Sequence, residues 1–220
     1  MNVKDMLRQA SDAAKQLITL SDQTIIGILK ETAQVLRTHT EEVLAANRQD
    51  LERMDPANPK YDRLKLTEER LQGIAADMEN VSTLPSPLNK VLSETTRPNG
   101  MVIRKVTVPF GVIGVIYEAR PNVTFDVFSL CFRSGNVCVL KGGSDADFSN
   151  RALVRIIHSV LERQGINPAV CTLLPPDREA TAELLGAVGL VDLIIPRSLR
   201  PGTRESSGDR DWRWYLSYLF

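Results

Sequence analysis

Apolar positions recur with a helical period in the first third of the chain. Between residues 1 and 82, apolar side chains return every three to four residues, as they do in amphipathic helices. Ser21 and Thr67 stand where two such helices would begin, because their hydroxyl oxygens can accept hydrogen bonds from otherwise unpaired amides. The pattern predicts helices over about 3–10, 22–36, 40–54 and 67–78. The polar stretch 46–50 is interpreted as a solvated face of the third helix.

The helical pattern stops after residue 82. Residues 83–98 are rich in Pro, Ser, Thr and Asn, which favours a connector. Asn99 and Gly100 form a typical hairpin-turn pair. Residues 101–108 then alternate between apolar and other side chains, and this alternation predicts an exposed strand.

The remaining pattern indicates a parallel sheet. Val112–Tyr117 and Val137–Leu140 are continuous apolar runs between glycine or proline residues, as expected for strands buried on both faces. Residues 123–132 between them have the length of a short crossover helix. Further strands are predicted at 170–174 and 191–195, and helices at 149–164 and 177–185. Strands that alternate with helices predict an α/β fold, here a Rossmann-like parallel sheet with a helical amino-terminal segment.

These elements suggest a division of the chain into four parts. Residues 1–82 form the helical amino-terminal segment of a cofactor-binding domain, and 83–108 form a connector with an exposed strand. Residues 109–197 form an incomplete Rossmann-like core. The charged, Trp-rich residues 198–220 do not continue the pattern and are predicted to be a disordered tail.

Composition excludes several classes of function. Lys plus Arg and Asp plus Glu number 27 each, so the chain lacks the basic surface that a nucleic-acid or membrane-surface partner requires. No apolar stretch approaches the roughly 20 residues that span a bilayer. The amino terminus lacks a signal-peptide pattern, which favours a cytoplasmic protein. The three cysteines have no CxxC spacing, so neither a disulfide framework nor a metal site is predicted.

Candidate chemistry lies after the two central strands. Ligands of open α/β sheets bind beyond the carboxyl ends of the strands, where Arg120, Pro121 and Asn122 follow one strand and Lys141–Ser144 follow the next. The Asn122 amide could donate a hydrogen bond to a developing oxyanion, although Pro-Asn is also an ordinary turn pair. Lys141 could reach a phosphate or a ribose, but an exposed strand-end lysine is an equal alternative. No GxGxxG dinucleotide fingerprint is present.

The same residues carry a family resemblance. The stretch VPFGVIGVIYEARPNVT, with SGNVCVLKGGS downstream, closely resembles the glutamate-5-semialdehyde dehydrogenase (gamma-glutamyl phosphate reductase) family of the aldehyde dehydrogenase superfamily. The resemblance covers about residues 1–197. It implies an oxidoreductase of proline biosynthesis that reduces L-glutamyl 5-phosphate with NADPH, releases phosphate and self-associates into a homo-oligomer.

The resemblance also implies roles for individual residues. Asn122 corresponds to the amide that stabilises the oxyanion, and Lys141 to a lysine that contacts the adenosine ribose and its 2′-phosphate. Ser144 stands where NAD-preferring relatives carry an acid, which is consistent with NADP. The remaining cofactor-binding candidates are Arg120, Pro121, Gly142 and Gly143.

The chain departs from the family after Arg197. The catalytic domain, with its nucleophilic cysteine, is expected there and does not follow; none of Cys131, Cys138 and Cys171 matches its motif. Permitted codons for residues 205–220, read one nucleotide later, can encode a segment that resembles the family's. We therefore expect either a frameshifted, truncated and inactive copy or a sequencing artefact of a whole one. One alternative is a non-catalytic NADP-binding or interaction protein that uses the new tail. Another is a related acyl-phosphate or aldehyde dehydrogenase with a different substrate.

Overall fold

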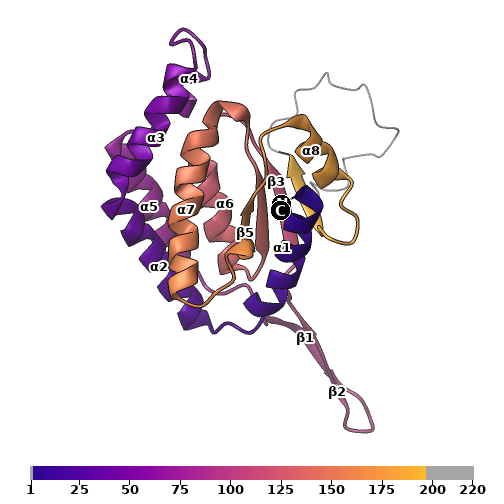
Figure 1. The fold of residues 1–220 in the computed structure, drawn as a ribbon. Coiled ribbons are helices and arrows are strands. Elements are labelled where there is room, and N and C mark those ends of the chain that lie inside the picture. Colours follow the sequence, from indigo (N-terminus) through magenta and orange to yellow (C-terminus); the bar gives the residue numbers. More distant parts are fainter. Residues whose placement is uncertain (1, 197–220) are drawn as a thin grey trace.

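The computed structural model describes residues 2–196, so the tail predicted at 198–220 lies outside the described residues. The chain forms helices on both faces of a parallel sheet, together with a separate two-stranded hairpin (Figure 1). The amino-terminal helices are α1 (Val3–Leu17), α2 (Asp22–Thr38), α3 (Thr40–Glu52), α4 (Tyr61–Leu64) and α5 (Glu68–Thr83). The hairpin strands are β1 (Val91–Thr96) and β2 (Val102–Val106). The alternating part contains β3 (Val112–Ile116), α6 (Asn122–Arg133), β4 (Val137–Lys141), α7 (Asp147–Arg163), β5 (Cys171–Leu173), α8 (Arg178–Leu185) and β6 (Leu193–Pro196), with short 3₁₀ turns at Ser144–Ala146 and Pro168–Val170.

The sheet has the order β5-β4-β3-β6, and all of its neighbouring strands are parallel. The predicted Rossmann-like α/β fold is therefore confirmed. β4 and β5 follow one another on one side of β3, and the chain then crosses back and places β6 on the other side of β3. The strand order therefore reverses between β3 and β6. Ligands of open α/β sheets bind at the carboxyl edge near such a reversal.

The helices form two layers around this sheet. α6 and α7 pack with α2 and α5 on one face, and α1 and α8 lie together on the other (Figure 1). β3 and β4 are almost fully buried, as their unbroken apolar sequences predicted. Phe125, Phe128 and Phe132 of α6 are among the largest fully buried side chains and join the sheet to the helical segment.

Two predicted helix starts are confirmed. The Ser21 hydroxyl accepts a hydrogen bond from the amide of Thr24 at 3.1 Å, and the Thr67 hydroxyl accepts one from the amide of Arg70 at 3.1 Å. Each bond satisfies an amide that the first turn of a helix leaves without a backbone partner.

Two local predictions were wrong. Residues 83–98 were assigned to a connector, but they contain β1, which pairs with β2 in an antiparallel hairpin. The stretch 46–50 is not a solvated face, because the side chains of Asn47 and Asp50 are buried where α3 packs against α7.

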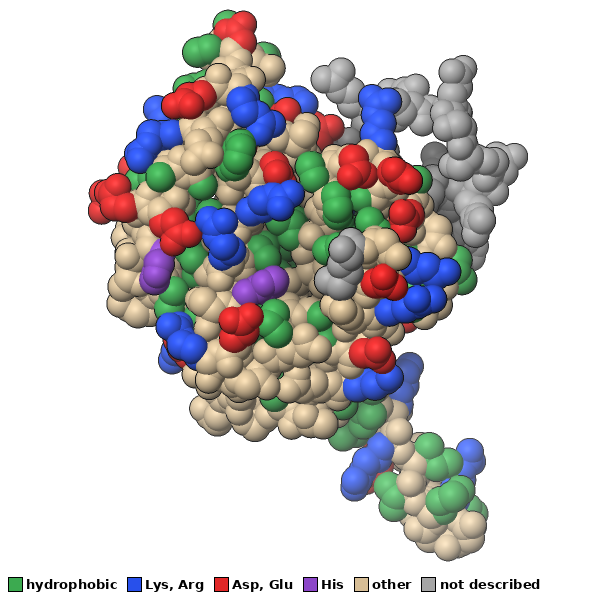
Figure 2. Space-filling model, viewed as in Figure 1, with side chains coloured by type: hydrophobic (Ala, Val, Ile, Leu, Met, Phe, Trp, Pro, Cys, Tyr) green, Lys and Arg blue, Asp and Glu red, His purple; other side chains and the backbone are tan. Residues whose placement is uncertain are grey.

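The hairpin extends away from the body of the molecule, at the amino end of β3 (Figure 1). Every residue of β1 and β2 is exposed. The predicted turn is confirmed, with Gly100 at φ +83°, a conformation that glycine adopts readily. In the space-filling view the hairpin carries both hydrophobic and basic side chains and stands clear of the other elements (Figure 2).

Gly111 allows β3 to begin beside β6. Its φ is +118°, and a Cβ atom there would lie 2.3 Å from Oδ2 of Asp192. That carboxylate oxygen accepts a hydrogen bond from the amide of Val112 at 2.8 Å. A side chain at residue 111 would therefore push apart the starts of β3 and β6.

Within residues 2–196, no helix combines the length and the apolar character needed to cross a membrane.

Candidate active site at the carboxyl edge of the sheet

The two predicted strand-end segments lie side by side. Ile116 pairs with Lys141 in the parallel register of β3 and β4, and the amide of Tyr117 donates to the carbonyl of Lys141 at 3.0 Å. Residues 120–122 and 141–144 therefore leave the sheet at the same edge. The structure brings together segments that the sequence placed separately; the functional roles of their residues stay predictions.

Asn122 is the first residue of α6 and is half-buried. Its Nδ2 donates one hydrogen bond to Oδ2 of Asp126 at 3.1 Å. An amide nitrogen carries two hydrogens, so this bond orients the group and leaves one donor for a ligand. Such an oriented amide can stabilise negative charge that develops on a carbonyl oxygen.

Lys141 is buried, so the alternative of an exposed strand-end lysine was wrong. Only 6% of the residue is exposed. Its ammonium donates to the carbonyl oxygens of Gly142 at 3.0 Å and Pro176 at 3.1 Å. Burial lowers the pKa of this ammonium, and the carboxylate of Asp177 opposes that shift. Because an ammonium has three donors, one remains for a ligand.

The turn after β4 rests on a buried polar network. The hydroxyl of Tyr117 bonds that of Thr124 at 2.8 Å, and Thr124 donates to Oδ1 of Asn150 at 3.0 Å. Burial raises the pKa of Tyr117, which keeps its phenol protonated. A Cβ atom on Gly142 would lie 2.3 Å from Nδ2 of Asn150. The chain itself therefore requires glycine at residue 142.

The first amides of α7 are already occupied by a side chain of α3. Asp50 accepts hydrogen bonds from the amide of Phe148 at 3.2 Å, the amide of Ser149 at 2.8 Å and the Ser149 hydroxyl at 2.6 Å. Asn47 bonds the same hydroxyl and the backbone of Leu64 and Leu66. The α7 amino terminus therefore does not offer these amides to a phosphate, unlike the helix that follows a GxGxxG turn.

Sequence reasoning missed Asn47 and Asp50 although a signal was available. Val43, Ala46, Asn47 and Asp50 follow the i, i+3, i+4, i+7 spacing that places residues on one helix face. The face that contains Val43 packs into the core. Polar residues at these positions are therefore buried and need internal partners.

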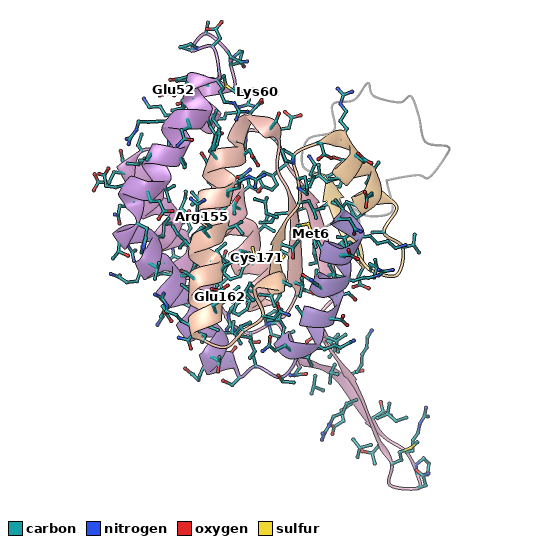
Figure 3. All side chains as sticks on the ribbon, in the orientation of Figure 1. Met6, Glu52, Lys60, Arg155, Glu162 and Cys171 are labelled. Atoms are coloured by element: carbon teal, nitrogen blue, oxygen red, sulfur yellow. The ribbon has the colours of Figure 1, made fainter. Side chains whose placement is uncertain are left out.

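Arg53 is a second residue that the sequence did not reveal. Its guanidinium donates to the carbonyl of Ser144 at 2.9 Å and lies over the ring of Phe148, 5.2 Å from the centroid. Lys60 lies nearby, with its ammonium 3.3 Å from the Glu118 carboxylate and 3.6 Å from that of Asp145. Figure 3 labels Lys60 beyond the end of α3, the helix that ends at Glu52. Two cations thus connect the α3–α4 region with the strand-end loops.

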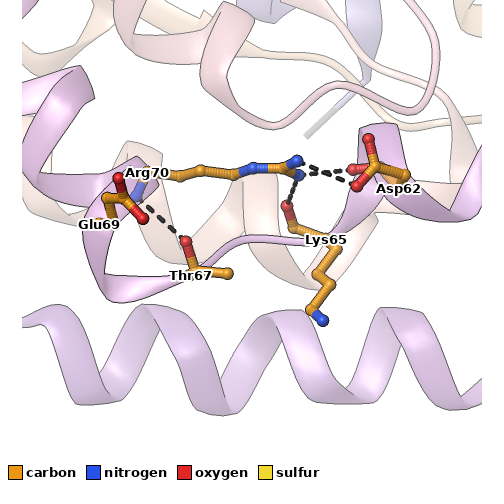
Figure 4. Close-up of a pocket in the computed structure, with 5 residues that line it drawn as sticks. All are labelled: Asp62, Lys65, Thr67, Glu69 and Arg70. Carbon is orange, nitrogen blue, oxygen red and sulfur yellow. Dashed lines mark hydrogen bonds and ion pairs between the residues drawn. The ribbon is translucent and has the colours of Figure 1, made fainter.

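A groove of about 330 Å³ borders Asn122. Arg120 and Asn122 form one side, and the segment from α4 into α5 forms the other. Close to it, the Arg70 guanidinium binds the carbonyl oxygens of Asp62 and Lys65, both at 2.6 Å, and the Asp62 carboxylate at 3.0 Å (Figure 4). These bonds fix the turn between α4 and α5. The volume of the groove itself is at the lower end of the roughly 300–1,000 Å³ range of small-molecule sites.

The three cysteines of the chain are all buried and none lines this groove. Burial raises the pKa of Cys131, while a hydrogen bond with Cys171 and burial both raise that of Cys138. Raised thiol pKa values disfavour the thiolate that acts as a nucleophile. Within residues 2–196, no three His, Cys, Asp or Glu side chains are grouped as metal ligands.

The comparisons with known proteins agree with the resemblance noted in the sequence. The chain is 99% identical over 197 residues to the gamma-glutamyl phosphate reductase of Parabacteroides distasonis, a match that covers 90% of this chain and 48% of that protein. The resemblance to gamma-glutamyl phosphate reductases is confirmed. The chain spans about half the length of the curated relatives it matches. No family model matches it.

Solved structures support the same conclusion. A gamma-glutamyl phosphate reductase from Thermotoga maritima is 31% identical with a TM-score of 0.86, and the match covers 90% of this chain and 49% of that one. A benzaldehyde dehydrogenase from Corynebacterium glutamicum is 17% identical with a TM-score of 0.69, covering 88% and 40%. At that identity, the likeness to an aldehyde dehydrogenase concerns the fold.

Proposed function

We propose that this chain contributes the cofactor-binding part of a cytoplasmic oxidoreductase of proline biosynthesis. The reaction is the NADPH-dependent reduction of L-glutamyl 5-phosphate to L-glutamate 5-semialdehyde with release of phosphate. The observation that carries the proposal is the 99% identity over 197 residues to a protein named gamma-glutamyl phosphate reductase. We assign residues 109–197 to the NADP-binding core, 1–82 to its helical segment and 83–108 to the connector with its exposed hairpin.

The residues at the strand ends fit a cofactor with a 2′-phosphate. Lys141 keeps one ammonium donor, and Arg53 holds a second cation against Ser144. Such cations favour a 2′-phosphate, whereas NAD-specific sites carry an acid that binds the ribose hydroxyl. We propose that Lys141, Gly142, Gly143, Ser144 and Pro121 contact the cofactor.

A bound NADPH would supply the hydride for the reduction. The Asn122 amide would stabilise the negative charge that develops on the substrate carbonyl oxygen. The burial of all three cysteines supports the further proposal that the described residues bind cofactor without turnover.

The first test is a titration of this chain with NADPH and NADH, followed by nucleotide fluorescence. We expect NADPH to bind more tightly. Lys141→Met should weaken NADPH binding about tenfold, because it removes a charge-assisted contact, and should leave NADH binding nearly unchanged. Lys30→Met, on the exposed surface of α2, is the matched control.

Arg53→Gln provides a second variant, since Arg53 is exposed and its loss should not disturb the core. Equal affinity for the two nucleotides in the unsubstituted chain would contradict the proposed preference for NADP.

The hairpin supports a proposal about assembly. Val91, Leu92, Met101, Val102, Ile103 and Val106 are all large apolar residues with more than two fifths of their surface exposed. Contiguous exposed apolar residues mark interaction surfaces. We infer that β1 and β2 mediate self-association into a homo-oligomer.

A further inference from the structure

Charged residues make up much of the lining of the groove beside Asn122. Among them, Arg63, Lys65, Asp77 and Arg120 form no hydrogen bond or ion pair through their side chains with the rest of residues 2–196. Three unpaired cations and one unpaired carboxylate around a small groove favour a ligand that is mainly anionic and also carries a cationic group.

The two sides of the groove come from distant parts of the sequence. Arg120 and Asn122 follow β3, whereas Arg63 and Lys65 follow α3, and Asp77 lies on α5. Leu66, Gly73 and Ile74 form the less polar lining between the charged residues. The groove therefore offers charges on both sides and a less polar stretch along its lining.

An amino-acid acyl phosphate has matching chemistry. One end carries a phosphoryl group on the reacting carbonyl carbon, the middle is aliphatic, and the other end carries an ammonium and a carboxylate. The phosphoryl group is attached to the carbonyl carbon, so it must lie beside Asn122 if Asn122 binds the carbonyl oxygen. Arg120 is the lining cation closest to Asn122 in the sequence. Guanidinium groups suit phosphate because they present several donors in a fixed plane.

Resting on the function proposed above, we propose that this groove is the substrate subsite. Arg120 binds the phosphoryl group that leaves as inorganic phosphate. Arg63 binds the α-carboxylate, and Asp77 binds the α-ammonium group. Arg120 is thereby assigned to the substrate rather than to the cofactor.

The reverse reaction separates these roles. Oxidation of L-glutamate 5-semialdehyde by NADP forms a bond between the acyl carbon and inorganic phosphate, and transfers the aldehyde hydride to NADP with release of a proton. Phosphate is then a substrate with its own KM. The assay uses the Parabacteroides distasonis reductase, which is 99% identical to this chain over 197 residues, with substitutions at the corresponding positions.

Arg120→Gln should raise the KM for phosphate by about tenfold or more, with little change in the KM for the semialdehyde. Arg63→Gln and Asp77→Asn should show the opposite pattern. All three side chains are exposed, so the variants should unfold at the same temperature as the unsubstituted enzyme. Arg8→Gln on α1, across the sheet from the groove, is the matched control.

Three results would overturn parts of this proposal. If Arg120→Gln leaves the phosphate KM unchanged and weakens NADPH binding, Arg120 belongs to the cofactor site. If Arg63→Gln and Asp77→Asn leave the semialdehyde KM unchanged, the amino-acid end binds elsewhere. If the unsubstituted enzyme shows no phosphate-dependent oxidation, the proposed function fails, a result distinct from a change in either KM.

Discussion

The two ends of the parallel sheet differ in which side chains are buried: polar side chains are buried at the carboxyl edge, and large apolar side chains are exposed at the amino edge. At the carboxyl edge, Asp50, Asn150 and Lys141 are buried and hydrogen-bonded. At the amino edge, β1 and β2 expose large apolar side chains. Buried polar groups cost stability unless they are paired, so the paired groups at the carboxyl edge fix the shape of a site. The exposed apolar side chains of β1 and β2 do not stabilise the body of the protein; they form a surface on which another copy of the chain can pack.

From this comparison we expect substitutions of buried polar residues to have the largest effect on the free energy of unfolding. Asp50→Ala should lower the free energy of unfolding by about 3 kcal/mol, because it leaves two amides and a hydroxyl of α7 without an acceptor. Urea unfolding of this chain measures the loss. Gln49→Ala, at the adjacent exposed position of α3, is the control and should stay within about 0.5 kcal/mol.

An equal loss in Asp50→Ala and Gln49→Ala would break the comparison, since it would mean that the buried bonds contribute no more than a surface side chain.

A smaller effect should appear in the pH dependence of stability. Burial raises the pKa of Asp50, and the hydrogen bonds from Ser149 and Phe148 oppose that shift. With a raised pKa, the folded chain holds the proton at a pH where the unfolded chain, at about 3.9, has lost it. The stability linked to this proton is therefore complete below the unfolded pKa and is lost as the pH rises through the folded pKa.

Asp50→Asn cannot titrate, so it should flatten this part of the stability profile. Urea midpoints between pH 3 and pH 7 provide the measurement. A profile for Asp50→Asn with the same slope as that of the unsubstituted chain would assign the pH dependence to other carboxylates.

The sequence predicted those features that depend on local pattern. β3 and β4 were found because strands buried on both faces are continuous apolar runs, and the starts of α2 and α5 because Ser21 and Thr67 are good caps. The sequence placed residues 120–122 and 141–144 beyond strand ends, where ligands of α/β sheets bind. That these two strands are neighbours is a finding of the structure.

The remaining features depend on tertiary contacts. β1 has no buried face, so residues 91–96 lack the apolar alternation that marks a strand. The available signal was the hairpin-turn pair Asn99-Gly100, which requires a partner strand before the turn as well as after it. The groove exists because the turn between α4 and α5 lies against Arg120 and Asn122. Side chains far apart in sequence form it, so no spacing along the chain could indicate it.

The smallest effect on stability should come from the hairpin. Ile103→Lys adds a charge to an exposed position of β2, so the free energy of unfolding in urea should change by no more than about 0.5 kcal/mol.

The effect of Ile103→Lys on assembly should be large, because a charge on an edge strand opposes pairing with another copy. Light scattering should report a smaller species for Ile103→Lys, while Lys105→Ala, on the same exposed strand, should leave the assembly unchanged. A monomeric unsubstituted chain would show that residues 91–106 do not associate in this protein, and a destabilised Ile103→Lys would show that the hairpin supports the body after all.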